Sequence, residues 1–464
     1  MLNIHYRIKQ LVLLGGDVCL FVIATVFAII VRHRFVFTSK DVTEALYWFA
    51  FLIPLWIVVL YINGTYDIGK HRTFSSLSLR IVQTLFINAS IGVLFFYIFQ
   101  THTFSPKTIL LLTLSAAYIL ILLWRTIFAR FFATRTFTSR ILFVGYTPEM
   151  EELAHIMREK PERGYTLSAW ITDESRRLKE IFPDTTFYSS TSTIRPSVSV
   201  HHINDVIIAS DVRQNEAIRH ELYELLFWQV NIRSLTALYE TLTGRIPPYT
   251  FSETWFLDHL QHSVHPMYER THRLMDIVCG SILFLIFLIL FPFIALAIKL
   301  TSPGPILFRQ ERMGHGGTPF FLLKFRSMYA LAEDGSAETA GVEFATKNDK
   351  RITRVGKFLR KARLDELPQT INLLKGNLSL IGPRPERPDI VRTLESQMPY
   401  YPIRHIIKPG LTGWAQVNQH YTETLEQSLQ KLQYDVYYIK NRSILLDLSI
   451  LLKTVNVIVR GMGQ

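Results

Sequence analysis

Cysteine and charge are both scarce in this chain of 464 residues. Cysteine occurs only twice, at Cys19 and Cys279, far apart and each within a hydrophobic stretch. This usage argues against a disulfide framework and against a cysteine-based zinc site, and it is compatible with a reducing compartment. Charged residues make up 19% of the chain and hydrophobic residues 49%. That balance indicates a membrane protein.

Acidic residues are fewer than basic ones, and the formal net charge is +12. Such an excess suits contact with anionic lipid headgroups or phosphorylated substrates as well as with nucleic acid. Because the basic residues lie beside apolar stretches and form no separate basic domain, nucleic acid is the weaker interpretation. No cleavable signal peptide is apparent, since the first apolar run lacks a small-residue cleavage site and predicts a membrane anchor.

Four apolar runs occupy the first part of the chain, at 11–31, 46–63, 81–99 and 108–128. Each is near the ~20 residues with which a helix crosses a bilayer. The sequence therefore predicts four transmembrane helices in a first domain, 1–135.

Charge in the loops predicts the orientation of these helices. The basic residues on one side are Arg7, Lys9, Lys70, Arg72, Arg80, Arg125, Arg130, Arg135 and Arg140, and those on the other are Arg32, Arg34, Lys40 and Lys107. The majority favours both ends of the domain in the cytoplasm. Asp17, inside the first run, is either a functional intramembrane acid or a side chain that reaches the interface or a neighbouring helix.

Residues 136–264 form a second, soluble-looking region in which strand-like and helix-like segments alternate. The predicted strands are 140–145, 169–171 and 206–209, and the predicted helices are 149–159 and 216–227. This alternation predicts a small Rossmann-like α/β domain. Its first turn, 145–148, lacks the glycine series that lets a backbone approach a pyrophosphate. We therefore do not expect nucleotide binding there, and favour a role in regulation or dimer contact.

The apolar run 274–300 permits two paths through a membrane. As a straight helix it would extend about 40 Å, enough to span a bilayer. However, Pro292 lies well inside it, where proline removes a helix hydrogen bond and bends the chain. Basic residues also flank both ends. A helix broken at Pro292 that enters and leaves by one face satisfies both observations, so we expect a re-entrant helix at the start of a third domain, 265–464.

An acidic pair, Asp365-Glu366, stands in strongly basic surroundings within 359–385. Such a pair before a helix is usually a cap, and Asp365 is expected to cap a new helix that has Pro368 in its first turn. A helix N-terminus flanked by arginines suits a phosphate. The two carboxylates suit one nucleophilic oxygen and one ligand for a hard divalent cation.

Five ordered motifs extend the pattern, and over about 268–464 they resemble those of the bacterial sugar transferases called polyprenyl-phosphate hexose-1-phosphate transferases, the large monotopic phosphoglycosyl transferases. The motifs are 303–305 with 308–314, then 324–328, 364–369, 382–385 and 409–416. The resemblance implies a membrane protein of α plus α/β class: four transmembrane helices, a Rossmann-like module, and a mainly α catalytic domain with a re-entrant membrane helix.

The same resemblance implies an activity. A hexose-1-phosphate would pass from a UDP-sugar to polyprenyl (undecaprenyl) phosphate, with release of UMP, to start exopolysaccharide, capsule or O-antigen repeat units. It implies that Asp365 is the nucleophile, forming an aspartyl-phosphosugar intermediate, and that Glu366 holds Mg²⁺. The catalytic domain would lie on the cytoplasmic face of the bacterial inner membrane, and a homodimer is a further expectation.

Five basic residues are candidates for binding the substrate phosphates. Arg360 and Arg384 match motif positions and offer planar, often bidentate contacts, and Arg384 is alternatively a structural residue of the turn 382–385. Lys324 and Arg326 either contact the sugar phosphate or stabilise the fold. Lys408 occupies a position where many relatives carry arginine, so it keeps the charge without the fork geometry.

Two other functions compete with this one. A membrane-anchored nucleotide-sugar dehydratase would need a glycine-rich turn and a Tyr-x-x-x-Lys pair, and no tyrosine after residue 140 has a lysine four positions later. A non-catalytic membrane scaffold or regulator of polysaccharide export would not be expected to retain Asp365, Glu366, Arg360 and Arg384 together.

Three features of the last domain keep structural interpretations open. Trp414 is either an interfacial anchor or a core residue. Residues 445–459 predict an amphipathic helix that lies on the bilayer or packs within the domain. His315, His405 and His420 lack metal-ligand spacing and are interpreted as structural.

Overall fold

The computed structural model describes residues 4–32, 39–66, 74–99, 106–131, 138–209, 215–228, 230–260, 266–330, 351–419 and 424–459. Residues Arg34, Lys70, Arg72, Arg135 and His420, which the sequence predictions used, lie outside this set. The chain divides into two compact units, Met1–Gly244 and Arg245–Gln464. The three predicted domain ranges stay a prediction.

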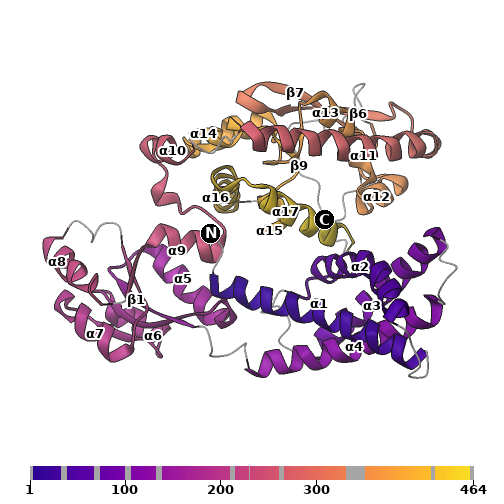
Figure 1. Ribbon diagram of the computed structural model, residues 1–464. Coiled ribbons are helices and arrows are strands. Elements are labelled where there is room, and N and C mark those ends of the chain that lie inside the picture. The colour runs from indigo at the N-terminus through magenta and orange to yellow at the C-terminus, as the bar shows by residue number, and fades with distance from the viewer. Residues whose placement is uncertain are drawn as a thin grey trace. The chain divides into compact units, whose positions relative to one another are not determined.

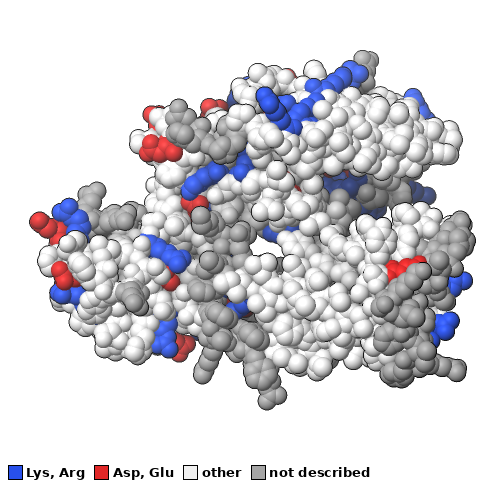
Figure 2. Space-filling model, viewed as in Figure 1, with Lys and Arg blue, Asp and Glu red and all other residues white. Residues whose placement is uncertain are grey.

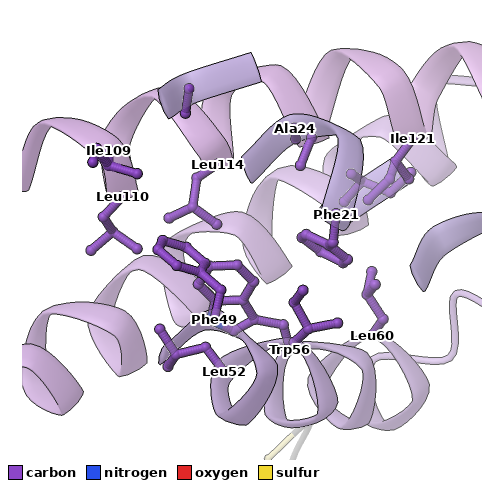
Figure 3. Packing of buried hydrophobic residues seen from close by; sticks show 14 of the residues in the cluster. Phe21, Ala24, Phe49, Leu52, Trp56, Leu60, Ile109, Leu110, Leu114 and Ile121 are labelled. Atoms are coloured by element: carbon purple, nitrogen blue, oxygen red, sulfur yellow. The ribbon is translucent and has the colours of Figure 1, made fainter. Parts of the chain in front are cut away.

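Four long helices open the first unit (Figure 1): α1 (Ile4–Arg32), α2 (Ser39–Ile62), α3 (Phe74–Phe99) and α4 (Pro106–Phe131). Each contains an apolar stretch of 21 to 25 residues, long enough to cross a membrane. The four apolar runs are thus confirmed as helices, and the chain is a membrane protein. Phe21, Phe49 and Trp56 meet in the packed interior of these helices (Figure 3), while their outer surface in Figure 2 is broadly uncharged.

One ion pair is buried among these helices. Nη2 of Arg125 in α4 lies 2.6 Å from Oδ2 of Asp17 in α1, and the hydroxyl of Tyr66 donates to the same oxygen at 2.8 Å. An unpaired charge inside a membrane is costly, and ionisable side chains there are usually paired in this way. The interpretation of Asp17 as a side chain that reaches a neighbouring helix is confirmed.

A parallel five-stranded sheet follows, in the order β3-β2-β1-β4-β5. Its strands are β1 (Ser139–Val144), β2 (Tyr165–Ile171), β3 (Thr186–Tyr188), β4 (Asp205–Ile208) and β5 (Asn231–Ser234). Helices α5 (Pro148–Glu159), α6 (Ser175–Ile181) and α9 (Leu235–Thr243) pack on one face, and α7 (Ile194–His201) and α8 (Glu216–Leu225) on the other. Short 3-10 helices η1 (Pro161–Arg163) and η2 (Thr191–Thr193) lie in the connections. The predicted α/β alternation is confirmed.

The turn after β1 is unlike a phosphate-binding turn. The side chain of Thr147 caps α5 by accepting from the backbone N–H of Met150, and Glu149 and Glu151 stand in the first turn of that helix. Glu151 pairs with Arg177 at 2.7 Å. Acidic side chains thus already complement this helix N-terminus, and the expectation on nucleotide binding stays a prediction.

The second unit is mainly helical. Its helices are α10 (Glu253–Leu260), α11 (Pro266–Thr301), α12 (Arg354–Lys361), α13 (Gln369–Lys375), α14 (Pro388–Gln397), α15 (Trp414–Asn418), α16 (Leu425–Asn441) and α17 (Ile444–Val459), with 3-10 helices η4 (Pro248–Thr250), η6 (His315–Gly317), η7 (Leu364–Glu366) and η8 (Tyr401–Ile406). Strands β6 (Leu307–Met313) and β7 (Pro319–Phe325) form an antiparallel hairpin, and β8 (Ser379–Ile381) pairs in parallel with β9 (Gly410–Thr412).

The core of this unit settles the interpretation of Trp414 and shows how residues 445–459 pack. Trp414 is 6% exposed and stacks on Tyr437 with ring centroids 5.8 Å apart, so it is a core residue. Helix α17 packs within the domain through Ile450 and Asp447, while Leu445 on its other side is 79% exposed.

Helix α11 lies against the unit along its whole length (Figure 1). Near its start, the hydroxyl of Tyr268 donates to Asp447 at 2.8 Å, and Oδ1 of Asp276 accepts from Ser379 at 2.9 Å. Farther along, the Phe287 ring lies 5.7 Å from that of Phe325 in β7. The opposite face exposes apolar side chains throughout: Leu274, Val278, Ile282, Leu285, Ile289, Phe293, Leu296 and Leu300.

Pro292 does not end the helix. The helical conformation runs unbroken through it from Pro266 to Thr301, so the predicted break is not an interruption of secondary structure. Proline removes one backbone hydrogen bond, at a cost of about 3 kcal/mol, and the packing of Phe287, Phe291 and Ile294 on the unit offsets this loss. The re-entrant path itself stays a prediction.

Candidate active site

The acidic pair lies where β7, α12, η7 and α13 meet. Arg363 adopts a left-handed conformation, with φ of 58°, and turns the chain from the end of α12 into η7. Leu364 and Leu367 then pack in the apolar cluster beneath α11. This anchoring fixes the two residues between them, Asp365 and Glu366.

Asp365 does not cap a helix, so that prediction was wrong. It lies inside η7, and α13 begins only at Gln369, directly after Pro368. The reason is the left-handed Arg363, which closes a short 3-10 turn before the α-helix can start. Asp365 is 8% exposed. Because its carboxyl caps no helix, its Oδ1 has no hydrogen-bond partner among the described residues.

Glu366 is surrounded by cations. Its Oε1 lies 3.2 Å from Nη2 of Arg384, 3.4 Å from Nζ of Lys324 and 3.8 Å from Nη1 of Arg363. Burial opposes ionisation of this carboxyl, but the positive charges of Lys324, Arg384 and Arg363 outweigh it and hold its pKa well below the usual value. Glu366 is therefore a firmly ionised carboxylate.

Asp365 is shifted in the other direction. Burial raises the pKa of its carboxyl, and the adjacent negative charge of Glu366 raises it further. Lys324, Arg360 and Arg363 oppose this rise. Two neighbouring carboxyls with divergent pKa values can take separate chemical roles, the more basic one being the better nucleophile.

Two of the predicted phosphate ligands lie elsewhere. The guanidinium of Arg326 donates to the backbone oxygens of Ser302 and Pro303, each at 2.7 Å, which secures the end of α11. These bonds favour the alternative that Arg326 stabilises the fold. Lys408 lies beside Gly376 at the C-terminal end of α13, whereas Glu366 precedes the N-terminal end of that helix.

Several residues of the site were not predicted as site residues from the sequence. Arg363 supplies both the backbone turn and a cation, and its position two residues before Asp365 was a visible signal. A second group of charged residues supports the loop 383–386, which carries Arg384. Its members are far apart in the sequence: Arg312, Glu386, Arg404, Lys431 and Asp435. No spacing in the sequence brings them together.

The donor set fits a magnesium ion shared with a substrate. No group of three His, Cys, Asp or Glu side chains able to hold a metal occurs in the part of the chain that the structure describes. Magnesium in phosphoryl-transfer sites commonly uses one or two carboxylates, and substrate phosphates and water complete its shell. Glu366 provides one such carboxylate. Asp365 beside it stays available as a nucleophile, and its buried Oδ1 has no hydrogen-bond partner within the described ranges.

The sequence matches two family patterns. Residues 267–461 match a family described as "Bacterial sugar transferase", and residues 61–235 match one described as "CoA-binding domain". The first match contains every element of the candidate site. The second covers part of the membrane helices and all five strands of the parallel sheet.

Individual relatives agree with the first match. A UDP-N-acetylgalactosamine-undecaprenyl-phosphate N-acetylgalactosaminephosphotransferase of Aeromonas hydrophila is 43% identical over 230 residues, which cover 48% of this chain and 51% of that protein. A UDP-glucose:undecaprenyl-phosphate glucose-1-phosphate transferase of Caulobacter vibrioides is 45% identical over 39% of this chain and 67% of its own. An exopolysaccharide production protein of Rhizobium leguminosarum is 39% identical over 37% of this chain and 86% of its own.

The matches cover different shares of the relatives' lengths. The chain spans about half the length of the Aeromonas protein but most of the Caulobacter and Rhizobium proteins. The matched part, 267–461, holds the acidic pair and its ring of cations. On this sequence and this geometry, the chain belongs to the bacterial sugar transferase family.

Proposed function

We propose that this protein transfers a hexose-1-phosphate from a UDP-sugar to polyprenyl phosphate, and so starts a polysaccharide repeat unit. The observation that carries the proposal is the buried Asp365 carboxyl, unpartnered among the described residues, beside a Glu366 held by cations. Four basic side chains act on these two carboxylates: Lys324, Arg360, Arg363 and Arg384. Their excess of positive charge suits a diphosphate, and a neutral substrate would leave it uncompensated.

The proposed reaction has two displacements at one phosphorus. A carboxylate oxygen of Asp365 attacks the phosphorus that bears the sugar, the bond from that phosphorus to the UMP oxygen breaks, and UMP leaves with the electron pair. A phosphate oxygen of the polyprenyl phosphate then attacks the same phosphorus. The bond to Asp365 breaks, which regenerates the carboxylate and leaves the sugar on a polyprenyl diphosphate.

The basic side chains have separate tasks in this proposal. Arg384 and Lys324 contact Glu366 and are placed to share their remaining donors with the diphosphate. Arg360 and Arg363 lower the cost of ionising Asp365 in its buried position. Mg²⁺, held by Glu366 with the substrate phosphates, would neutralise the charge that develops on the leaving UMP.

Removal of the metal provides the first check on this arrangement. We expect EDTA to reduce release of UMP in the first turnover by roughly 100-fold or more, because several kcal/mol of charge stabilisation are lost. Added Mg²⁺ should restore it. The variant Glu366→Gln should need more Mg²⁺ for half-maximal release, whereas Glu395→Gln, on the exposed side of α14, should not. Full activity in EDTA would remove the metal from the proposal.

The pH dependence provides a second check. Release of UMP requires ionised Asp365. Because its pKa is raised, activity should fall, as the pH is lowered, already above ~3.9, the ordinary pKa of aspartate. Arg360 lowers that pKa, so Arg360→Gln should move the acid limb of the first-turnover rate to higher pH. Lys361→Gln, the same charge change one residue later on α12, is the matched control. An acid limb that stays in place in Arg360→Gln would contradict the assigned electrostatics.

The packing of α11 supports a position of the catalytic unit on one face of the membrane. Its 36 residues form a helix about 54 Å long, and the folded unit contacts one side of it from Tyr268 to Ile298. A helix perpendicular to the bilayer would draw the polar groups of that unit into hydrocarbon. We therefore infer that the catalytic unit lies on one face of the membrane, with the apolar face of α11 in lipid, and the loop charges of the four N-terminal helices favour the cytoplasmic face.

Cysteine labelling tests this path. In a Cys19→Ser/Cys279→Ser background, Met267→Cys and Leu300→Cys place thiols at the two exposed ends of α11. We expect an impermeant maleimide to leave both unlabelled in intact cells and to label both in inside-out vesicles. Ile289→Cys, on the apolar face between them, should stay protected in both. Labelling of one end from each side would show a straight span.

The activity itself is tested with a panel of UDP-sugars. The names of the relatives divide between glucose and N-acetylgalactosamine, so the panel includes both, with polyprenyl phosphate and Mg²⁺. Formation of a polyprenyl diphosphate sugar together with UMP is the expected result. The absence of UMP from every donor would favour the non-catalytic scaffold. A homodimer is part of this proposal, and light scattering of the solubilised protein tests it.

A further inference from the structure

The loop that carries Arg384 is fixed by its backbone carbonyls. The oxygen of Pro383 accepts from the N–H of Gly410, and that of Pro385 accepts from the guanidinium of Arg312 at 3.0 Å. The oxygen of Glu386 accepts from the N–H of Met313 at 2.9 Å. The remaining carbonyl, that of Arg384 itself, accepts from Nη2 of Arg404 at 2.9 Å. Four successive carbonyl dipoles are thereby turned toward fixed donors.

Arg404 is itself held in a closed group of buried side chains. It is 2% exposed, and its Nη2 lies 2.8 Å from Oδ2 of Asp435 in α16, which is also 2% exposed. Its Nη1 donates to the hydroxyl of Tyr401 at 2.5 Å. Within the described part of the chain, neither Arg404 nor Asp435 pairs with a carboxyl of the acidic pair, and the direct contact from Arg404 to a residue that touches Glu366 is its hydrogen bond to the Arg384 carbonyl.

We propose that Arg404 is a positioning residue for Arg384: by holding the Arg384 carbonyl, it directs the Arg384 guanidinium onto Glu366 and the substrate diphosphate. This inference rests on the proposed function for its substrate and goes beyond it in assigning the Tyr401–Arg404–Asp435 group a role in the site. A buried ion pair is weak evidence for stability alone, because apolar replacements of similar volume often fold equally well. The Arg404 guanidinium of this ion pair does, however, fix the Arg384 carbonyl, which would otherwise be free to turn toward an anionic substrate.

The test separates positioning from folding. The apolar variant Tyr401→Phe/Arg404→Met/Asp435→Leu removes the whole group and leaves no buried charge of that group unpaired. We expect it to melt near the wild-type temperature and yet to lose roughly 100-fold in kcat/KM for first-turnover UMP release, the typical penalty for a misplaced group about 1 Å out of position. Arg404→Lys is a second variant that keeps the charge beside Asp435 but loses the planar fork, and it should show the same split between melting temperature and activity.

A double-mutant cycle with Arg384→Gln gives the decisive readout. If Arg404 acts through Arg384, the apolar variant should cause little further loss once Arg384 is gone, so the two losses do not multiply. The matched control is Arg442→Met, which removes a mostly buried arginine paired with Glu269 at 2.7 Å in the same unit. Its loss, whatever its size, should multiply with that of Arg384→Gln. Multiplication of the losses in the first cycle would overturn the inference.

Binding of inorganic pyrophosphate makes the test independent of transfer. We expect its affinity to fall about 10-fold or more in Arg384→Gln and in the apolar variant, and no further when the two are combined. A wild-type protein that binds pyrophosphate but releases no UMP would refute the proposed function and leave the positioning to be judged by this cycle. Wild-type affinity retained in the apolar variant, or no pyrophosphate binding at all, would overturn the positioning role.

Discussion

Asp365→Asn should lose release of UMP by roughly 10³-fold or more, the scale seen when a nucleophile is removed. The same substitution should not destabilise the protein. The pKa of Asp365 is higher in the folded protein than in the unfolded chain. Folding therefore becomes less favourable once the pH exceeds the pKa of the unfolded chain, and this cost of ionising Asp365 is present at neutral pH. The asparagine variant removes the cost and the repulsion from Glu366, so it should melt at the wild-type temperature or above. First-turnover UMP release and thermal melting measure the two effects.

The control for this prediction is Asp389→Asn. Asp389 is another carboxylate of the same unit, at the start of α14, where it pairs with Arg387 at 3.1 Å. It should retain release of UMP within a few fold. A labelled sugar-phosphate that remains on the wild-type chain after denaturation, and is absent from Asp365→Asn, would identify the covalent step. Normal UMP release by Asp365→Asn would rule out Asp365 as the nucleophile.

Arg404→Met alone should be among the most destabilising changes in the second unit, by about 3–5 kcal/mol. It leaves Asp435, itself 2% exposed, without the arginine that lies 2.8 Å away. The protein should melt at a clearly lower temperature than either the wild type or the apolar variant, in which neither charge of the pair is left behind. Thermal unfolding of the solubilised protein gives the comparison.

Arg442→Met is the control with which the loss of stability in Arg404→Met is compared. Its partner, Glu269, is 43% exposed and can be hydrated after the arginine is gone, so we expect a loss of only about 1 kcal/mol or less. Equal destabilisation by the two substitutions would mean that burial of the partner carboxylate is not the cause. The prediction therefore concerns Asp435 as much as Arg404.

Much of the fold follows from local pattern. The apolar runs at α1 to α4 are long enough to cross a bilayer, and helix is the conformation that satisfies their backbone hydrogen bonds within one segment. Strands β1 and β4 are largely buried on both faces and form nearly continuous apolar runs. The edge strands β3 (Thr186–Tyr188) and β5 (Asn231–Ser234) are half exposed and more polar, so their sequences carry no such signal and were missed.

The candidate site divides along a similar line. Asp365, Glu366, Arg360, Arg384 and Lys324 were found because their motifs are local in the sequence. Arg326 and Lys408 matched motifs equally well, but the structure places the first at the end of α11 and the second at the far end of α13. A motif records which residues a family keeps, and it does not tell a residue that binds substrate from one that holds the backbone.

The sequence by itself determined the membrane helices, the α/β alternation and the identity of the acidic pair, since each depends on neighbours within a few turns of chain. Only the tertiary structure decided that Asp365 is uncapped and buried, that three cations converge on Glu366, and that Arg404 and Asp435 meet beneath the Arg384 loop. The physical reason is distance along the chain. Burial and charge pairing are set by residues that approach one another only after the core has packed, and no local pattern encodes that approach.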